Sequence, residues 1–414
     1  MTGKNELLNV EKKPEKINTH IIRAKKAGVF FLLLFIVFFG MQIFQIGPWT
    51  FQPNLKWPYM YYIGDPQNSI GLSCGTPVDC KLILNYGENN ESFETSIVES
   101  VPTNLHFFNL TNLNLDTIYY WKLNSSDSNL NYPYLNKIYS FQTGPISTEK
   151  KPFKFCVLGD TRPDIWGNTK HIYLLKEALK EQPNFILNVG DMVLGPGITG
   201  HWDRWFYEVR ECAQKGIPIE MGLGNHEWDE YQWLFGFEDK GMTYKHYMEY
   251  PEPENYYAFN YSNAAFISLD TNEGETTEAQ IEWLNKTLEI ANADENIDWI
   301  IVFGHYPLYS EGGRSSRIGN PFENSFNYYN VDMYICGHIH HYARVQVNNI
   351  TYIISGGGGA ELDDRIDPTF PNTKKSAITF QYCTIEINGS KLNFKSISDN
   401  GILIDECQLT QWKG

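Results

Sequence analysis

The chain has 414 residues, of which 42% are hydrophobic and 20% are charged. This composition excludes a disordered, collagen-like or coiled-coil protein and is sufficient for two or three packed domains. Because 33 Lys and Arg stand against 49 Asp and Glu, the net charge is -16, and such a surface repels nucleic acid as a partner.

The first predicted element is a membrane anchor. Residues 1–26 form a basic tail, and residues 27–46 carry no charge. A helix over 27–46 would rise about 30 Å, the thickness of a bilayer's hydrocarbon core. A buried core helix would show a polar face, and a cleaved signal peptide would end in a small-residue site, which residues 41–45 do not offer. We expect a single-pass anchor in the cell membrane, with a cytoplasmic N-terminus and an extracellular remainder.

Residues 54–145 show the alternation of a β-sandwich. Apolar side chains recur at every second position in residues 70–74, 82–86, 117–123 and 138–143. Short runs of this kind, separated by Gly, Asn and Pro, indicate an all-β sandwich. No cluster of titratable residues is evident in this region.

The seven cysteines are compatible with an exported chain. Cys74 with Cys80, and Cys383 with Cys407, are two pairs that could form disulfides, and neither has metal-site spacing. Cys156 and Cys336 lie in apolar runs and are expected to be buried thiols.

After a polar linker at 144–151, residues 152–412 alternate strand-like and helix-like segments. Residues 172–179 and 281–291 each present one apolar helix face, the second behind a capping box formed by Thr277 and Gln280. Strands that alternate with helices predict an α/β layer structure.

Five apolar runs of this second domain each end in a residue type that binds metals. In chain order they deliver Asp160, Asp191, Asn225 with His226, His305, and His338 with His340. Because ligands bind at the carboxyl ends of strands in open α/β sheets, these residues can converge on one rim. A glycine precedes each motif and lets the backbone turn sharply.

Two carboxylates, one amide oxygen and three imidazoles form a mixed nitrogen and oxygen donor set. Such a set suits Mn, Fe or Zn and is a poor match for Ca²⁺ or for a thiolate site. One carboxylate can bridge two ions, and the neutral amide of Asn225 keeps the centre positive enough to attract a phosphate oxyanion.

The ordered motifs resemble the signatures of a known family. They are Gly159-Asp160, Gly190-Asp191, Gly224-Asn225-His226-Glu227, Gly304-His305 and Gly337-His338-Ile339-His340, and they resemble the five signatures of the calcineurin-like metallophosphoesterase superfamily. Residues 255–271, 337–344 and 352–360 are most similar to its purple acid phosphatase-like branch. Residues 110–123 and 139–145 resemble the fibronectin type III-like domain that precedes the catalytic domain in that branch.

The resemblance implies a four-layer α/β/β/α sandwich around a dinuclear centre. One ion would be held by Asp160, Asp191 and His340, and the other by Asp191, Asn225, His305 and His338. His226 would be an outer-sphere residue that faces the substrate.

Two positions depart from the family pattern. Members complete the shell of the first ion with a His two residues after the first Asp, or with a Tyr three residues after the second. This chain has Arg162 and Leu194 there. The first ion would bind more weakly, and the purple iron-tyrosinate colour is not expected. Arg162 either contacts the substrate phosphate with its planar fork or forms a surface salt bridge.

The expected function is extracytoplasmic hydrolysis of phosphate esters on small molecules by a metal-activated hydroxide, with His226 protonating the leaving oxygen. The alternative is a surface-binding or adhesion protein that keeps the fold without the reaction. A third interpretation, a ligand face made of Trp202, Trp205, Trp228 and Trp233, is not favoured, because such aromatics usually belong to a core. Residues 310–322, with Arg314 and Arg317, form a candidate specificity loop.

Overall fold

The computed structural model describes residues 54–164, 167–228, 239–272, 274–310, 320–363, 366 and 371–411. These residues belong to one compact unit. The predicted basic tail at 1–26 and the anchor at 27–46 lie outside them. Within the described ranges, no helix is long and apolar enough to cross a membrane.

The N-terminal part consists of two antiparallel sheets. The first has the order β1-β2-β5 and the second the order β4-β3-β6-β7. Their bounds are β1 (Lys56–Tyr61), β2 (Ile70–Cys80), β3 (Leu82–Gly87), β4 (Thr95–Val98), β5 (Thr103–Leu110), β6 (Ile118–Ser125) and β7 (Tyr139–Gln142). The four predicted runs coincide with β2, β3, β6 and β7, and their alternating apolar side chains pack around the buried Trp121.

Strand β1 joins this part to the rest of the molecule. Its Tyr59 and Tyr61 side chains are buried in the same apolar cluster as the α/β region. Lys56 Nζ lies 2.8 Å from the carboxylate of Asp203, and the amide of Tyr62 donates a 2.7 Å hydrogen bond to Glu220. The two parts therefore share a core.

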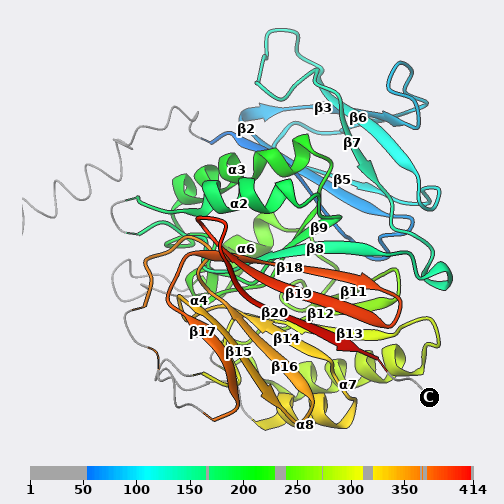
Figure 1. The fold of residues 1–414 in the computed structure, drawn as a ribbon. Coiled ribbons are helices and arrows are strands. Elements are labelled where there is room, and N and C mark those ends of the chain that lie inside the picture. The colour runs from blue at the N-terminus through cyan, green and yellow to red at the C-terminus, as the bar shows by residue number, and fades with distance from the viewer. Residues whose placement is uncertain are drawn as a thin grey trace, which may run out of the picture. The chain divides into compact units, whose positions relative to one another are not determined.

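The α/β region is built on two mixed sheets (Figure 1). One has the order β10-β9-β8-β18-β19-β20 and the other β11-β12-β13-β14-β16-β15-β17. The first contains β8 (Phe153–Leu158), β9 (Phe185–Asn188), β10 (Ile219–Met221), β18 (Gln381–Asn388), β19 (Lys391–Ser398) and β20 (Leu403–Thr410). The second contains β11 (Tyr257–Tyr261), β12 (Ala264–Ser268), β13 (Trp299–Phe303), β14 (Met333–Cys336), β15 (Tyr342–Val347), β16 (Ile350–Ser355) and β17 (Thr373–Ala377).

Helices pack on both sheets. The described helices are η1 (Ser147–Glu149), α2 (His171–Lys180), α3 (Thr199–Gln214), α4 (Asn225–Trp228), α6 (Met242–Tyr247), α7 (Glu278–Ala293) and α8 (Asn320–Tyr328). Apolar residues of α2 and α3 join a core with both sheets, whereas those of α7 and α8 pack on the second sheet alone. Only the N-cap half of the predicted capping box is present. Thr277 Oγ1 accepts a 3.2 Å hydrogen bond from the amide of Gln280, whereas Gln280 Oε1 accepts from the amide of Asp270 instead of closing the box.

All five motif-bearing runs are strands, but they do not lie in one sheet. Strands β8, β9 and β10 run parallel in the first sheet, and β13 and β14 run parallel in the second. The rim on which the motifs were expected to converge is therefore formed by two sheets. The antiparallel strands β18, β19 and β20, which extend the first sheet beyond β8, were not predicted.

The structure resolves several smaller predictions. All seven cysteines are unbridged, and Cys383 and Cys407 lie on strands that β19 separates. Trp202 and Trp205 are buried core residues, as expected. Trp233 and most of the candidate specificity loop, residues 311–319, lie outside the described residues.

The buried carboxyl group of Glu220 predicts a pH-dependent stability. Burial raises its pKa from 4.5 to about 8, so the folded protein binds this proton more tightly than the unfolded chain. The contribution of Glu220 to stability is fully present below about pH 4.5. Above that pH, this contribution to the free energy of unfolding should fall by about 1 kcal/mol per pH unit until about pH 8. Glu220→Gln, which keeps an acceptor for Tyr62, is expected to flatten this slope in urea denaturation.

The exposed Glu386 provides the control for that experiment. Glu386→Gln removes the same formal charge but should leave the slope unchanged. If Glu220→Gln retained the wild-type slope, the carboxyl group would not be protonated in the folded protein.

Candidate metal centre

The predicted site residues all lie where strands end. Asp160 follows β8, Asp191 follows β9, and α4 opens with Asn225 after the short segment 222–224 that follows β10. The second sheet contributes the segments after β13 and β14, which carry His305, His338 and His340. Residues that are far apart in the sequence thus reach one rim from two sheets.

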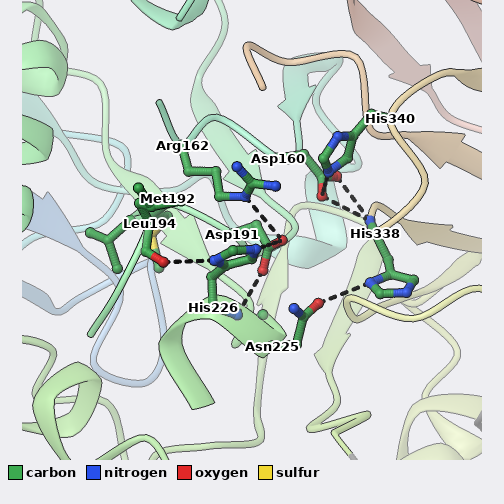
Figure 2. A network of polar contacts seen from close by, with 12 residues as sticks. Asp160, Arg162, Asp191, Met192, Leu194, Asn225, His226, His338 and His340 are labelled. Carbon is green, nitrogen blue, oxygen red and sulfur yellow. Dashed lines mark hydrogen bonds and ion pairs between the residues drawn. The ribbon is translucent and has the colours of Figure 1, made fainter. Parts of the chain in front are cut away.

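The central cluster is formed by two carboxylates and an imidazole. Donor atoms of Asp160, Asp191 and His305 lie within 4.8 Å of one another, and all three residues are buried. His305 Nε2 is 3.2 Å from Asp191 Oδ1. Asn225 Oδ1 lies 2.9 Å from His305 Nε2. It also lies 2.9 Å from His338 Nδ1 (Figure 2), so two further donors join the cluster.

The remaining predicted residues border the same carboxylates. His340 Nε2 is 3.4 Å from Asp160 Oδ1, and the amide of His338 donates a 2.9 Å hydrogen bond to Asp160 Oδ2. His226 Nε2 lies 3.7 Å from Asp191 Oδ2. The structure therefore brings together all six side chains predicted as ligands, with His226 beside them.

The backbone is strained at three of these residues. The φ angle is 56° at Asp160, 59° at Asp191 and 69° at His338, in a region that non-glycine residues rarely adopt outside functional sites. The neighbouring glycines provide space. A Cβ on Gly337 would lie 2.3 Å from Asp160 Oδ2, and one on Gly224 would lie 2.3 Å from Asp191 Oδ1. The sharp turns expected at the glycines are thus largely made by the site residues themselves.

Backbone carbonyls orient the imidazoles. His305 Nδ1 lies 3.0 Å from the carbonyl of Val189, and His340 Nδ1 lies 2.5 Å from the carbonyl of Glu361. Because a carbonyl only accepts, each Nδ1 carries the hydrogen and each Nε2 can offer a lone pair to a cation. Thr271 Oγ1 accepts a 3.1 Å hydrogen bond from the amide of His305 and holds its backbone.

Glu227 fixes two of the loops to each other, a role that the sequence analysis missed. Its Oε1 accepts hydrogen bonds from the amides of Met192 and Val193, at 2.7 and 3.0 Å. Its Oε2 accepts from the amides of Asp191 and Gly224, at 2.8 and 3.0 Å. The only sequence signal for these hydrogen bonds was that an acidic residue, Glu227, ends the Gly-Asn-His-Glu motif.

Both departures from the family pattern lie at the centre. Arg162 is only 6% exposed, with Nε 3.9 Å from Asp191 Oδ2 and Nη1 3.3 Å from Glu361 Oε2. Arg162 does form a salt bridge, as one alternative expected, and its partner Glu361 is mostly exposed, but the guanidinium itself is buried. Leu194 contributes its carbonyl, which accepts a 2.8 Å hydrogen bond from His226 Nδ1 and directs Nε2 toward Asp191.

Burial and neighbouring charges shift the pKa values of the groups at the centre. Burial alone would raise the pKa of Asp191, but His305, His226 and Arg162 hold it well below its usual value. Burial raises the pKa of Asp160 despite the nearby His340. For His305, burial would lower the pKa, yet the Asp191 carboxylate raises it to about 9.

This arrangement fits metal ions. Buried carboxylates require compensating charge, and they lie among imidazole and amide donors of the kind that bind Mn, Fe or Zn. Hydrogen bonds from Nδ1 of His305 and His340 to backbone carbonyls orient the Nε2 atoms of these rings. Imidazole ligands of metals usually receive this support. The donors are sufficient for two divalent or trivalent ions.

Residues 153–342 match the family model described as calcineurin-like phosphoesterase. This part of the chain is a calcineurin-like phosphoesterase domain, and the family prediction from the ordered motifs is confirmed.

Several of the relatives are purple acid phosphatases. Purple acid phosphatase 1 of Ipomoea batatas is 28% identical over 294 residues, which are 64% of this chain and 57% of that protein. The Fe(3+)-Zn(2+) purple acid phosphatase 12 of Arabidopsis thaliana is 27% identical over 339 residues, covering 73% of this chain and 68% of that one. The match to the Ipomoea protein thus spans less than two thirds of its length.

A solved structure has the same fold. Purple acid phosphatase PPD1 from yellow lupin (Lupinus luteus) seeds superposes with a TM-score of 0.74 at 18% identity, over 86% of this chain and 74% of that one. At this identity the similarity concerns the fold alone.

Proposed function

We propose that this protein is a metal-dependent phosphoric ester hydrolase that acts on phosphorylated small molecules. The observation that carries the proposal is the convergence of Asp160, Asp191 and His305 within 4.8 Å, with Asn225 and His338 directly beside them. The purple acid phosphatases among the relatives support the same reaction class. The family's four-layer sandwich and a fibronectin type III-like assignment for residues 54–145 belong to this proposal.

The metal assignment follows the donors. Asp160, Asp191 and His340 would hold one ion, and Asp191, Asn225, His305 and His338 the other. Two ions bound there would lower the pKa of a shared water and neutralise charge on the phosphoryl oxygens. The name of the Arabidopsis relative supports iron and zinc, and Mn remains the third metal of the prediction.

The protein's own side chains complete the reaction. His226, held by the carbonyl of Leu194, faces the reacting group and supplies a proton to the leaving oxygen. Arg162 offers a buried cation to the phosphate beside Asp191. Glu227 accepts a hydrogen bond from the amide of Asp191, and Thr271 accepts one from the amide of His305, so both residues fix the loops that carry the proposed ligands.

The cellular arrangement is proposed from the sequence. An uncharged stretch at 27–46 after a basic tail supports a single-pass anchor with a cytoplasmic N-terminus and an extracellular catalytic domain. Protease treatment of intact cells should then digest residues after Pro48 and spare an N-terminal tag.

Metal analysis combined with a substrate panel tests the hydrolase. The purified full chain should bind Mn, Fe or Zn and release phosphate from p-nitrophenyl phosphate, with phosphodiesters and nucleotides assayed in parallel. EDTA treatment should abolish turnover, and the added metal should restore it. Absence of both bound metal and turnover would instead support the non-catalytic binding or adhesion protein.

A further inference from the structure

The guanidinium of Arg162 has unused hydrogen-bonding capacity at the reacting centre. The residue is 6% exposed, yet its Nε has no hydrogen-bond partner among the described residues. The nearest carboxylate oxygen, Asp191 Oδ2, is 3.9 Å from Nε, beyond hydrogen-bonding distance. Leaving a buried cationic N–H without an acceptor is costly, so this position suggests a ligand that the protein does not itself supply.

Among the described residues, Nη1 of Arg162 makes one ion pair, and its geometry is loose. Nη1 lies 3.3 Å from Glu361 Oε2, and the side chain of Glu361 is 60% exposed. A second pair in the same chain shows the contrast. Arg344 binds Asp405 with two nitrogens, at 2.7 and 3.0 Å, in the bidentate geometry typical of a permanent structural pair.

The Glu361 side chain can leave without disturbing the centre. The contact between Glu361 and His340 runs through the backbone carbonyl, at 2.5 Å from Nδ1. The neighbouring Asp363 holds the same loop, because its carboxylate accepts a 2.8 Å hydrogen bond from the amide of His340. Rotation of the Glu361 carboxylate into solvent therefore leaves these contacts in place.

We propose that Arg162 is the phosphate-binding cation of this site and that Glu361 is its exchangeable partner, which the phosphate oxyanion displaces on binding. Glu361 acts as an internal anion that covers the guanidinium in the resting protein. Phosphate offers several oxygens to the planar fork and so also satisfies Nε, which the single contact with Glu361 does not. This inference rests on the proposed hydrolase function.

The affinity for inorganic phosphate tests the exchange in the metal-loaded full chain. Titration calorimetry should show that Glu361→Gln tightens the Kd about 2- to 5-fold, because an exposed ion pair that competes with phosphate is removed. Arg162→Met should weaken the Kd about 10-fold or more, because a charge-assisted contact is lost. In the Arg162→Met background, Glu361→Gln should have no effect, since the displaced contact no longer exists.

Glu386→Gln is the matched control. It removes one carboxylate at the opposite end of the first sheet, where Glu386 pairs with Lys154 near the start of β8, and it should leave the Kd unchanged. An unchanged Kd in Glu361→Gln, or tightening that persists in Arg162→Met, would overturn the exchange. Glu361→Gln carries the test by itself if Arg162→Met loses metal, because its side chain is mostly exposed.

Turnover of p-nitrophenyl phosphate on the same samples separates the two proposals. Normal turnover without the expected change in phosphate affinity would reject the exchange alone. Phosphate exchange without any turnover in the metal-loaded wild type would support the exchange and reject the hydrolase.

Discussion

Asp191→Asn is expected to remove metal from the centre and to lower kcat/KM by at least about 10³-fold. The substitution keeps the shape of the side chain but removes the charge that lies 3.2 Å from His305 and 3.9 Å from Arg162. The buried guanidinium of Arg162 would then face a neutral amide, and a cation would lose the residue that both proposed ion sites share. Metal content by elemental analysis and turnover of p-nitrophenyl phosphate measure the two losses.

Asp203→Asn is the appropriate comparison. Asp203 is as buried as Asp191, at 1% exposure, but its carboxylate binds Lys56 and the amide of Asn54. It should therefore lower stability while metal content and turnover per folded molecule stay at the wild-type level. If Asp191→Asn retained two ions and full turnover, the assignment of the metal centre would be wrong.

His226→Ala is expected to slow turnover by about 10² to 10⁴-fold without loss of metal, because a proton-transferring group contributes about this much. The side chain borders the cluster, with Nε2 3.7 Å from Asp191, but it is not among the proposed ligands. Removing it leaves the carboxylates and the other imidazoles in place.

The leaving group reveals which proton His226 moves. If His226 protonates the leaving oxygen, an alkyl phosphate should be affected more strongly than p-nitrophenyl phosphate, whose leaving group departs readily as an anion. Equal losses with both substrates would show that His226 acts elsewhere in the reaction. Loss of metal in His226→Ala would show instead that it supports an ion.

Local patterns predicted much of the fold and the site. The apolar runs before Asp160, Asp191 and His305 are strands, and the N-cap Thr277 begins a helix, because strand alternation and helix capping depend on neighbouring residues. The ordered glycine motifs were sufficient for the family, and they located every residue of the cluster.

Contacts between distant segments could not be predicted in the same way. Glu227 clamps amides that lie more than 30 positions away, and Glu361 reaches Arg162 across 199 positions. No local period signals such a contact, because it depends on how loops from different strands approach one another. For the same reason the strand pattern alone did not show which strands belong to which of the two sheets.

The chemistry of the centre was therefore readable from the chain, since residue type sets donor atoms and charge, and the spacing of the motifs placed each donor at the end of a strand. Three features became evident only in the tertiary structure. They are the burial and pairing of Arg162, the hydrogen bond from His226 to the carbonyl of Leu194, and the backbone strain at Asp160. These features arise from packing between residues far apart in the sequence, where solvent is excluded and each polar group must find its partner.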